Sequence, residues 1–466
     1  MVTATSAFLP LRLLQTACLV LLATGLGPAA LKAQETPVVS LQDFATAEVR
    51  QQGFTLPRPM KVHVFARGAG VRMGLGTNSG TRLFAAGWIL DAASREVVWQ
   101  MDAASSRRVG GSWIADRTLD LPAGRYEAYF ADYGFGENLL FAGWIRNIDR
   151  RDLLTLAAPR SSHSLLGALG LSREGVEQEW RRQVGRYGMQ ISVPSAEAAS
   201  VEAFAAPLRW KNSFLTLAAD RDGGRWTQAF RVQRPIALHV YAEGEASGRR
   251  MVDTGWIRDA RTRKAVWEMT EAKAQYAGGA GKNRRQVEVI QLPAGDYLAT
   301  FVTDDSHSPA DWNALPPCDP GRYGLTLSTP ADADLQAVSL IPEPAPGPVL
   351  AELVRVADDQ DLRAPFVLKG EQAVRVYAIG ERDDDEMADG AWVEDAHGKT
   401  VWRMDDLRTE PAGGATKNRQ VDEVVTLPGG SYTLRVRTDG SHAYGEWNAG
   451  RPWDPEHYGA TVYGVR

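Results

Sequence analysis

The chain has 466 residues, of which 44% are hydrophobic and 23% are charged, and it contains 14 tryptophans. This composition excludes an intrinsically disordered chain and a membrane-embedded one. The formal net charge of −5 argues against a nucleic-acid partner, because proteins that bind nucleic acids concentrate positive charge.

Residues 1–33 predict a secretory signal. Arg12 precedes an apolar run over residues 13–26, and small residues follow near Ala30 and Ala33. We therefore expect a secreted protein, periplasmic or extracellular, with no membrane span in the mature chain. Removal of Cys18 with this segment leaves Cys318 alone, so no internal disulfide is expected.

The rest of the chain contains an internal repeat. The second copy contains GWIRDARTRKAVWEM at residues 255–269, AGGAGKNR at 277–284, LPAGDY at 292–297 and TDDSHSPADWNALPPCDPGRYG at 303–324, and the third copy repeats these motifs about 135 residues later. The first copy keeps GWILDAASREVVWQM and LPAGRY but lacks the KNR and SH…WN segments. Any site common to the repeats is therefore expected only in the second and third copies.

Composition shifts place the boundaries between these copies. The expected organisation is a signal peptide (1–33), a degenerate first repeat (40–194), a linker (195–207), a second repeat (208–329), a linker rich in Pro and Ala (330–350) and a third repeat (351–466). The first repeat carries an inserted segment at about 135–185, in which residues 172–188 have the spacing of an amphipathic helix.

Within a repeat the hydrophobic pattern has a period of two, which is typical of strands with one buried face. In SYTLRVR, for example, Tyr432, Leu434 and Val436 alternate with polar residues. The predicted fold is all-β: three tandem antiparallel β-sandwich modules, Ig-like or jelly-roll-like, the first with a helical insertion. The tryptophans of the WI and VW motifs are interpreted as core residues.

The Pro-x-Gly sequence before each conserved Tyr of the repeat suggests a tight hairpin turn. If Leu292 and Tyr297 flank that turn, the two strands pair so that Asp305 faces Arg284 and His307 faces Lys282. The same rule in the third repeat places Gly440 opposite Arg419 and His442 opposite Lys417. The KNR and DSH segments are thus predicted to meet at one end of each sandwich.

These two segments supply the candidate ligand-binding residues, which combine cations, amides, a histidine and a tryptophan. They are Lys282, Asn283, Arg284, Asp304, Ser306, His307, Trp312 and Asn313 in the second repeat, and Lys417, Asn418, Arg419, Asp439, Ser441, His442, Trp447 and Asn448 in the third. Two interpretations remain open: a ligand pocket, and a structural latch in which the two loops satisfy each other's polar groups.

A divalent metal is an alternative reading of the same loops, although no cofactor is expected. Its ligands would be Asp304, His307 and Asp311, matched by Asp439, His442 and Glu446, since one histidine with two carboxylates is a recognised ligand set. The lysine and arginine side chains predicted nearby would compete for these carboxylates.

No catalytic motif is present in the sequence. It has no Gly-x-Ser-x-Gly elbow, no His-Glu-x-x-His helix, no phosphate-binding glycine loop and no dinucleotide fingerprint. The favoured function is a non-enzymatic interaction or ligand-binding scaffold whose partner is a polysaccharide or a cell-envelope protein. The alternatives are a hydrolase that uses a metal or carboxylates in the same loops, and a purely structural envelope protein.

The set of motifs VWEM, AGGxxKNR, LPAGxY and DDSHSxxxWNAxPPxDP resembles a repeat of secreted bacterial proteins to which no activity is attached. The resemblance covers the second and third copies well and the first in part. It implies a secreted protein built of β-sandwich repeats, and implies no ligand or catalytic residue.

Overall fold

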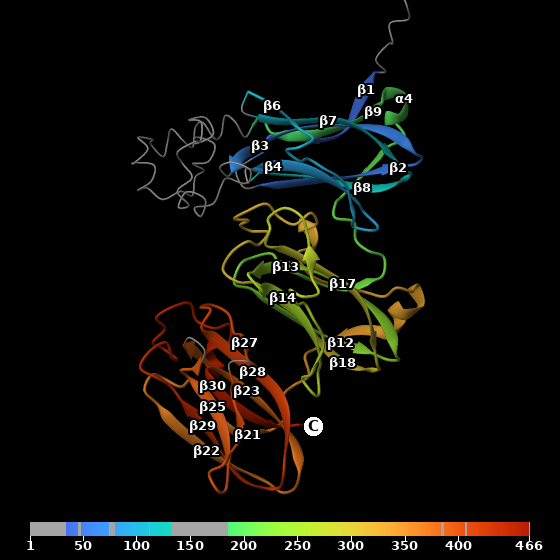
Figure 1. The fold of residues 1–466 in the computed structure, drawn as a ribbon. Coiled ribbons are helices and arrows are strands. Elements are labelled where there is room, and N and C mark those ends of the chain that lie inside the picture. Colours follow the sequence, from blue (N-terminus) through green and yellow to red (C-terminus); the bar gives the residue numbers. More distant parts are fainter. Residues whose placement is uncertain are drawn as a thin grey trace, which may run out of the picture.

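The computed structural model describes residues 34–44, 48–73, 80–110, 112–132, 185–383, 386–405 and 408–465. Three β-sandwiches follow one another in chain order from the top to the bottom of Figure 1. The predicted signal segment lies outside the described residues. So does the predicted helix at 172–188, apart from its last four residues, which form a turn and the start of a strand.

The second module shows the topology most fully. One of its sheets has the order β11-β19-β13-β17-β16 and the other β20-β12-β18-β14-β15, and the two join where β13 pairs with β14. The strands are β11 (Ser213–Ala218), β12 (Arg225–Val232), β13 (Ile236–Ser247), β14 (Arg250–Asp259), β15 (Ala265–Glu268), β16 (Gln275–Tyr276), β17 (Asn283–Leu292), β18 (Gly295–Val302), β19 (Gly324–Ser328) and β20 (Val338–Ile341).

The third module repeats this arrangement. Its sheets have the orders β21-β30-β23-β28-β27 and β22-β29-β25-β26, with β24 paired to β23. The strands are β21 (Val349–Val354), β22 (Asp361–Leu368), β23 (Gln372–Asp383), β24 (Glu386–Met387), β25 (Gly390–Asp395), β26 (Thr400–Arg403), β27 (Glu410–Pro411), β28 (Asn418–Leu427), β29 (Gly430–Arg437) and β30 (Gly459–Gly464).

The first module has the same order of strands. One sheet is β1-β9-β3-β7-β6, and the other is β10-β2-β8-β4-β5. The strands are β1 (Glu35–Leu41), β2 (Val49–Leu56), β3 (Met60–Met73), β4 (Gly80–Asp91), β5 (Val97–Gln100), β6 (Arg107–Val109), β7 (Ser112–Leu121), β8 (Gly124–Asp132), β9 (Gly188–Pro194) and β10 (Glu202–Phe204). A short helix, α4 (Ser195–Ala198), precedes β10.

The order of the eight principal strands defines the sandwich type. In each module the first, eighth, third and sixth principal strands form one sheet, and the second, seventh, fourth and fifth form the other. This is the jelly-roll arrangement, so the predicted all-β tandem sandwich is confirmed, and the jelly roll is the form it takes.

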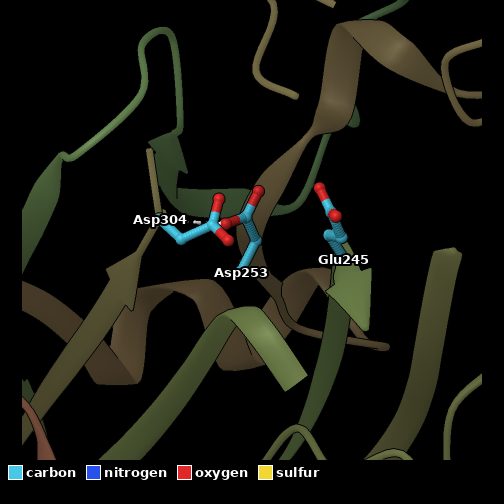
Figure 2. Close-up of side chains that lie close together, drawn as sticks. All are labelled: Glu245, Asp253 and Asp304. Carbon is cyan, nitrogen blue, oxygen red and sulfur yellow. Dashed lines mark hydrogen bonds between the residues drawn. The ribbon is translucent and has the colours of Figure 1, made fainter. Parts of the chain in front are cut away.

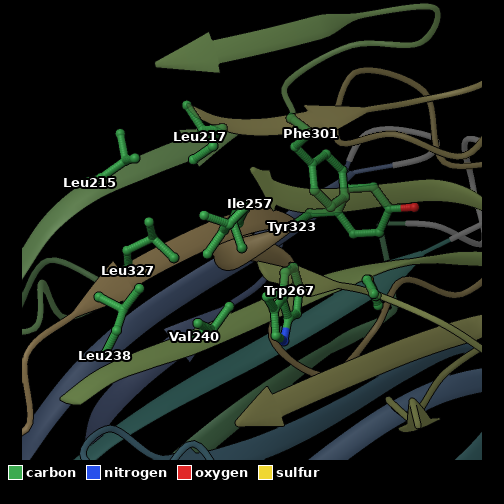
Figure 3. Packing of buried hydrophobic residues seen from close by; sticks show 14 of the residues in the cluster. Leu215, Leu217, Leu238, Val240, Ile257, Trp267, Phe301, Tyr323 and Leu327 are labelled. Atoms are coloured by element: carbon green, nitrogen blue, oxygen red, sulfur yellow. The ribbon is translucent and has the colours of Figure 1, made fainter. Parts of the chain in front are cut away.

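The core of each sandwich follows from the period-two pattern. In the second module Leu238 and Val240 of β13 face Ile257 and Phe301 of the opposite sheet, and all four are fully buried (Figure 3). Burial of such side chains contributes roughly 1.5–3 kcal/mol each. The tryptophan of the VW motif, Trp267, lies in the same cluster.

The predicted hairpin at the Pro-x-Gly turn is wrong. Strand β17 pairs with β13 and β16, whereas β18 pairs with β12 and β14, so the turn crosses from one sheet to the other. Residue alternation shows which face is buried and does not identify the neighbouring strand. The turn is held by the hydroxyl of Tyr297, which donates a hydrogen bond to the carbonyl of Pro293 at 2.9 Å.

Both segments expected to be linkers contain ordered structure. Strand β10 pairs with β2, and β20 pairs with β12 in the corresponding place of the next module. Residues 342–348 then lead to β21 without regular structure. The first and second modules are therefore each extended by an edge strand before the chain enters the next module.

Candidate functional site

The KNR and DSH segments do meet at one end of the second and third modules, although not in the predicted register. Lys282 Nζ donates to Asn313 Oδ1 at 2.8 Å, and His307 Nε2 lies 2.7 Å from Asn283 Oδ1. In the third module Lys417 reaches Asn448 at 2.8 Å, and His442 reaches Asn418 at 2.7 Å. The contacts therefore repeat in both copies.

The predicted cross-strand pairs at this end do not form. Arg284 donates to the carbonyls of Gly281 and Asn283 at 2.8 and 3.1 Å, and the side chain of Asp305 is exposed. In the third module Arg419 is buried and donates to Thr409. Each of these arginines therefore forms hydrogen bonds within the loops of its own module.

His307 is the centre of the network in the second module. It is fully buried with a φ of 70°, and burial together with the Lys282 charge lowers its pKa to about 3. The amide nitrogen of Asn283 donates to two backbone carbonyls, so its oxygen faces the ring and accepts from Nε2–H. The other ring nitrogen, Nδ1, lies 3.0 Å from Asn313 Oδ1, so His307, which its lowered pKa keeps neutral, links the two loops through both asparagines.

The tryptophan of each loop closes the network from the core side. Trp312 packs edge-on against His307 and Tyr323, with ring centroids 4.8 and 5.0 Å apart. Trp447 repeats this in the third module against His442 and Tyr458, at 5.2 and 5.0 Å. Trp312 is buried, whereas Trp447 is half-buried. Of the candidate ligand-binding residues in the second module, Lys282, Arg284, Asp304, Ser306 and Asn313 keep partial exposure.

Beside this network each module gathers three carboxylates. Glu245, Asp253 and Asp304 offer oxygens that all lie within 4.8 Å of one another (Figure 2), and Glu381, Asp389 and Asp439 do the same in the third module. Such a set of oxygen ligands suits a hard divalent cation.

The carboxylates of the second module are partly satisfied by protein donors. Asp253 accepts from the backbone N–H of Asp304 at 2.7 Å and from the hydroxyl of Tyr323. Glu245 accepts from Lys282 at 2.9 Å through one oxygen, and its other oxygen is buried with no hydrogen-bond partner among the described residues. Burial raises the pKa of Glu245 to about 7 and raises the pKa of Asp253 and Asp304.

The predicted metal ligands are distributed differently from the sequence expectation. Of the six, only Asp304 and Asp439 belong to these carboxylate groups. The two histidines bond to asparagines, while Asp311 and Glu446 are exposed.

The acids that the sequence reasoning missed lie on the strand pair that joins the two sheets. Glu245 pairs directly with Asp253, and the equivalent pair in the first module is Ala69 with Ala85. A sequence signal for these acids was present. In both later repeats a Gly-Glu pair is followed eight residues later by an Asp, which stands three residues before a Trp.

A groove lies where the first module meets the second. It has a volume of about 530 Å³ and is lined by the turn of the first module and the outer sheet face of the second. The lining residues are Ala93, Ser94, Glu96, Trp210, Lys211, Asn212, His239, Tyr241, Lys273, Gln275, Arg285, Val287, Ser328 and Thr329. Its size and its mixture of aromatic and polar groups are typical of ligand sites at domain interfaces.

Together the topology and the repeated loop ends define a tandem jelly-roll protein with two equivalent polar sites. No protein-family model matches the chain, and no curated protein is similar to it. Among the described residues no helix is long and apolar enough to cross a membrane.

Two solved structures show a faint similarity. One is described as the CBM32-1, CBM32-2 and M60 catalytic domains from Clostridium perfringens ZmpB, with 9% identity and a TM-score of 0.14, over 89% of this chain and 52% of that one. The chain thus spans about half the length of that protein. The other is the vicilin from Solanum melongena, with 11% identity and a TM-score of 0.14, over 63% of this chain and 74% of that one. At these TM-scores neither similarity says how this chain is built or what it binds.

Proposed function

We propose that this protein is an exported, non-enzymatic scaffold that binds a polysaccharide or another cell-envelope partner. The observation that carries the proposal is the groove of about 530 Å³ between the first and second modules. It is the place where aromatic rings, cations and amides converge on a concave surface, which is the combination that recognises sugars.

The aromatic part of the groove is held in place by packing. Trp210 lies edge-on to Tyr241 with centroids 5.3 Å apart, and the guanidinium of Arg322 sits 4.0 Å from the centre of the Trp210 ring. The indole nitrogen of Trp210 is buried and has no hydrogen-bond partner among the described residues.

The groove is preformed because the two modules are joined firmly. Trp88 and Tyr129 of the first module belong to the hydrophobic cluster of the second, and the indole of Trp88 donates to the carbonyl of Cys318 at 2.6 Å. A rigid groove loses little conformational freedom when it binds, which favours affinity.

The loop ends of the second and third modules form a second candidate surface. Their partly exposed members, including Lys282, Ser306 and Lys417, stand at equivalent places on two modules of one chain. Two such contacts would raise avidity for a repetitive polymer. The buried members, Asn283 and His307, would act by holding these loops in shape.

The experiment is a binding measurement with Trp210→Ala. We expect glycan oligomers that bind the wild-type protein in isothermal titration to lose at least tenfold in affinity for this variant. The matched control is Trp392→Ala, since Trp392 is also a half-buried tryptophan beneath an arginine but lies outside the groove. Equal affinity of the two variants for the glycan would contradict glycan binding in the groove. A wild-type protein that binds no glycan or envelope fraction supports the purely structural alternative.

The carboxylate groups favour one further candidate, a metal-dependent hydrolase. Its ligands would be Glu245, Asp253 and Asp304, with Glu381, Asp389 and Asp439 as a second set. Turnover of a glycan or peptide that stops on addition of EDTA and in Glu245→Gln would support it. Binding without turnover in the presence of calcium, magnesium, manganese or zinc supports the scaffold.

A further inference from the structure

The turn between the fourth and fifth strands has a left-handed residue at the same place in all three modules. It is Arg95 in the first module (φ 62°), Arg263 in the second (φ 59°) and Gly398 in the third (φ 77°). Glycine adopts this conformation without strain, whereas arginine does not. The two arginines therefore call for an explanation in their side chains.

Arg95 is explained by its partners. Its guanidinium donates to both oxygens of Glu127 at 2.8 Å and to both oxygens of Asp319 in the second module. The side chain is 1% exposed and every nitrogen has a partner. Arg95 thus joins the first module to the second.

Arg263 occupies the equivalent place toward the third module but lacks such partners. Its side chain is 5% exposed, and its buried Nε has no hydrogen-bond partner among the described residues. The nearest acids are Asp422 at 3.6 Å and Glu343 at 3.8 Å. Asp422 is already engaged, because both of its oxygens accept from Arg375 at 2.6 and 2.9 Å.

The guanidinium of Arg263 borders a cavity. This groove has a volume of about 580 Å³ and lies between the second module, the segment 344–347 and the third module. Arg231, Arg261 and Arg375 line it as well, together with the carboxylates of Asp259 and Asp296. Asp259 is engaged by its own turn, where it accepts from the backbone N–H groups of Arg261 and Thr262. Arg231 is neutralised by Asp296 at 2.6 and 2.8 Å, while Arg261 is exposed. Burial lowers the pKa of Arg263 because its neighbours do not offset the cost of placing the charge there.

We infer that the groove between the second and third modules binds an oxyanion, through the guanidinium of Arg263 and with Arg261 at its rim. The planar fork of arginine matches a carboxylate with two parallel hydrogen bonds, so the favoured ligand is a carboxylate carried by an acidic polysaccharide. Sulfate and phosphate esters offer the same oxygens. This site rests on the second junction alone and does not depend on sugar binding at the first.

The test uses Arg263→Gly in the full chain, because glycine stands at the equivalent place in the third module. Oligogalacturonate is the carboxylate probe, inorganic sulfate and phosphate are the tetrahedral probes, and a neutral cello-oligosaccharide is the uncharged control. In isothermal titration at low salt, we expect saturable binding of an oxyanion probe to the wild-type protein and at least a tenfold loss in Arg263→Gly. Preference for oligogalacturonate over both inorganic ions identifies a carboxylate, and the reverse order identifies a sulfate or phosphate ester.

Two further variants make the result decisive. Arg117→Glu reverses an exposed arginine charge on the first module, outside this groove, and is expected to keep the wild-type affinity for the oxyanion. Arg261→Glu reverses an exposed charge and is expected to weaken binding without affecting folding, so it serves if Arg263→Gly does not fold. Unchanged affinity in both Arg263→Gly and Arg261→Glu, or no binding of any oxyanion probe to the wild-type protein, overturns the inference. Loss of oxyanion binding in Trp210→Ala would instead move the site to the first groove.

Discussion

Arg95 of the first module and Asp319 of the second form a fully buried ion pair across a sequence separation of 224 residues. Glu127 completes the group, accepting from Arg95 and from the backbone N–H of Leu208, the latter at 2.5 Å. One arginine therefore ties together the first module, the chain that leaves it and the loop end of the second module. The corresponding arginine at the next junction has no such partners.

This difference predicts opposite effects of the same substitution at the two junctions. Arg95→Gly leaves Glu127 buried without its counter-charge and leaves Asp319 with Arg322 alone, at 3.8 Å, and breaking a buried pair in this way costs about 3–5 kcal/mol. We expect urea unfolding monitored by tryptophan fluorescence to show the unfolding of the first two modules at markedly lower denaturant concentration. Arg263→Gly removes a guanidinium whose Nε has no hydrogen-bond partner among the described residues and whose ion pairs are 3.6 and 3.8 Å long, and it is expected to change the free energy of unfolding by less than about 1 kcal/mol. Equal losses in the two variants would contradict this account.

The buried histidine predicts a defined pH dependence. The pKa of His307 is lowered to about 3 in the folded protein, against about 6.5 in an unfolded chain, so below pH 6.5 only the unfolded state takes up the proton. The stabilising contribution is therefore complete above pH 6.5 and declines as the pH falls toward 3, by about 2 kcal/mol between pH 7.5 and 5. Because buried acids such as Glu245 titrate in the opposite sense, the quantity to measure is the difference between the wild-type protein and His307→Gln. A difference in unfolding free energy that is constant from pH 7.5 to 5 would refute the neutral buried histidine.

The carboxylate groups predict a response to divalent cations. Calcium would relieve the repulsion among Glu245, Asp253 and Asp304, so we expect millimolar calcium chloride to raise the unfolding temperature of the wild-type protein and EDTA to reverse the rise. The double variant Glu245→Gln/Glu381→Gln should lose this response. Glu352→Gln is a suitable control, since Glu352 lies on β21 outside both groups. If calcium has no effect on the unfolding temperature of the wild-type protein, the lysines Lys282 and Lys417 are the cations that neutralise these carboxylates, and no metal is needed.

The turn that crosses between the sheets predicts a small and uniform effect in every module. The hydroxyls of Tyr126, Tyr297 and Tyr432 each donate to a proline carbonyl four residues earlier, at 3.0, 2.9 and 2.8 Å. Each single Tyr→Phe substitution is expected to lower the free energy of unfolding by about 1 kcal/mol, because it removes one hydrogen bond and leaves the packing in place. Chemical denaturation of the three variants checks this. A loss of several kcal/mol in one of them would show that the hydroxyl does more than hold its turn.

Several features could be predicted from the amino-acid order alone. Alternation such as that of Tyr432, Leu434 and Val436 determines strands with one buried face, and the structure confirms tandem sandwiches built from them. The meeting of His307 with the KNR segment was also predicted, but from a β17–β18 hairpin that does not form. The strand patterns are local, and the hydrophobic effect acts on them wherever the chain folds.

Other features depended on which strands become neighbours, and a period of two carries no information about that. The sequence led to a β17–β18 hairpin, whereas the jelly roll places these strands in different sheets. The pairing of Glu245 with Asp253 depends on the strand pair that joins the sheets.

Contacts between modules were likewise decided only by the tertiary structure. Trp88 reads as a core residue of its own module but belongs to the hydrophobic cluster of the next one. A net charge of −5 gives no hint that Arg231, Arg261, Arg263 and Arg375 line one groove. Sequence determined the modules because their cores arise from short-range patterns. Tertiary structure decided the sites because each depends on side chains brought together from distant parts of the chain.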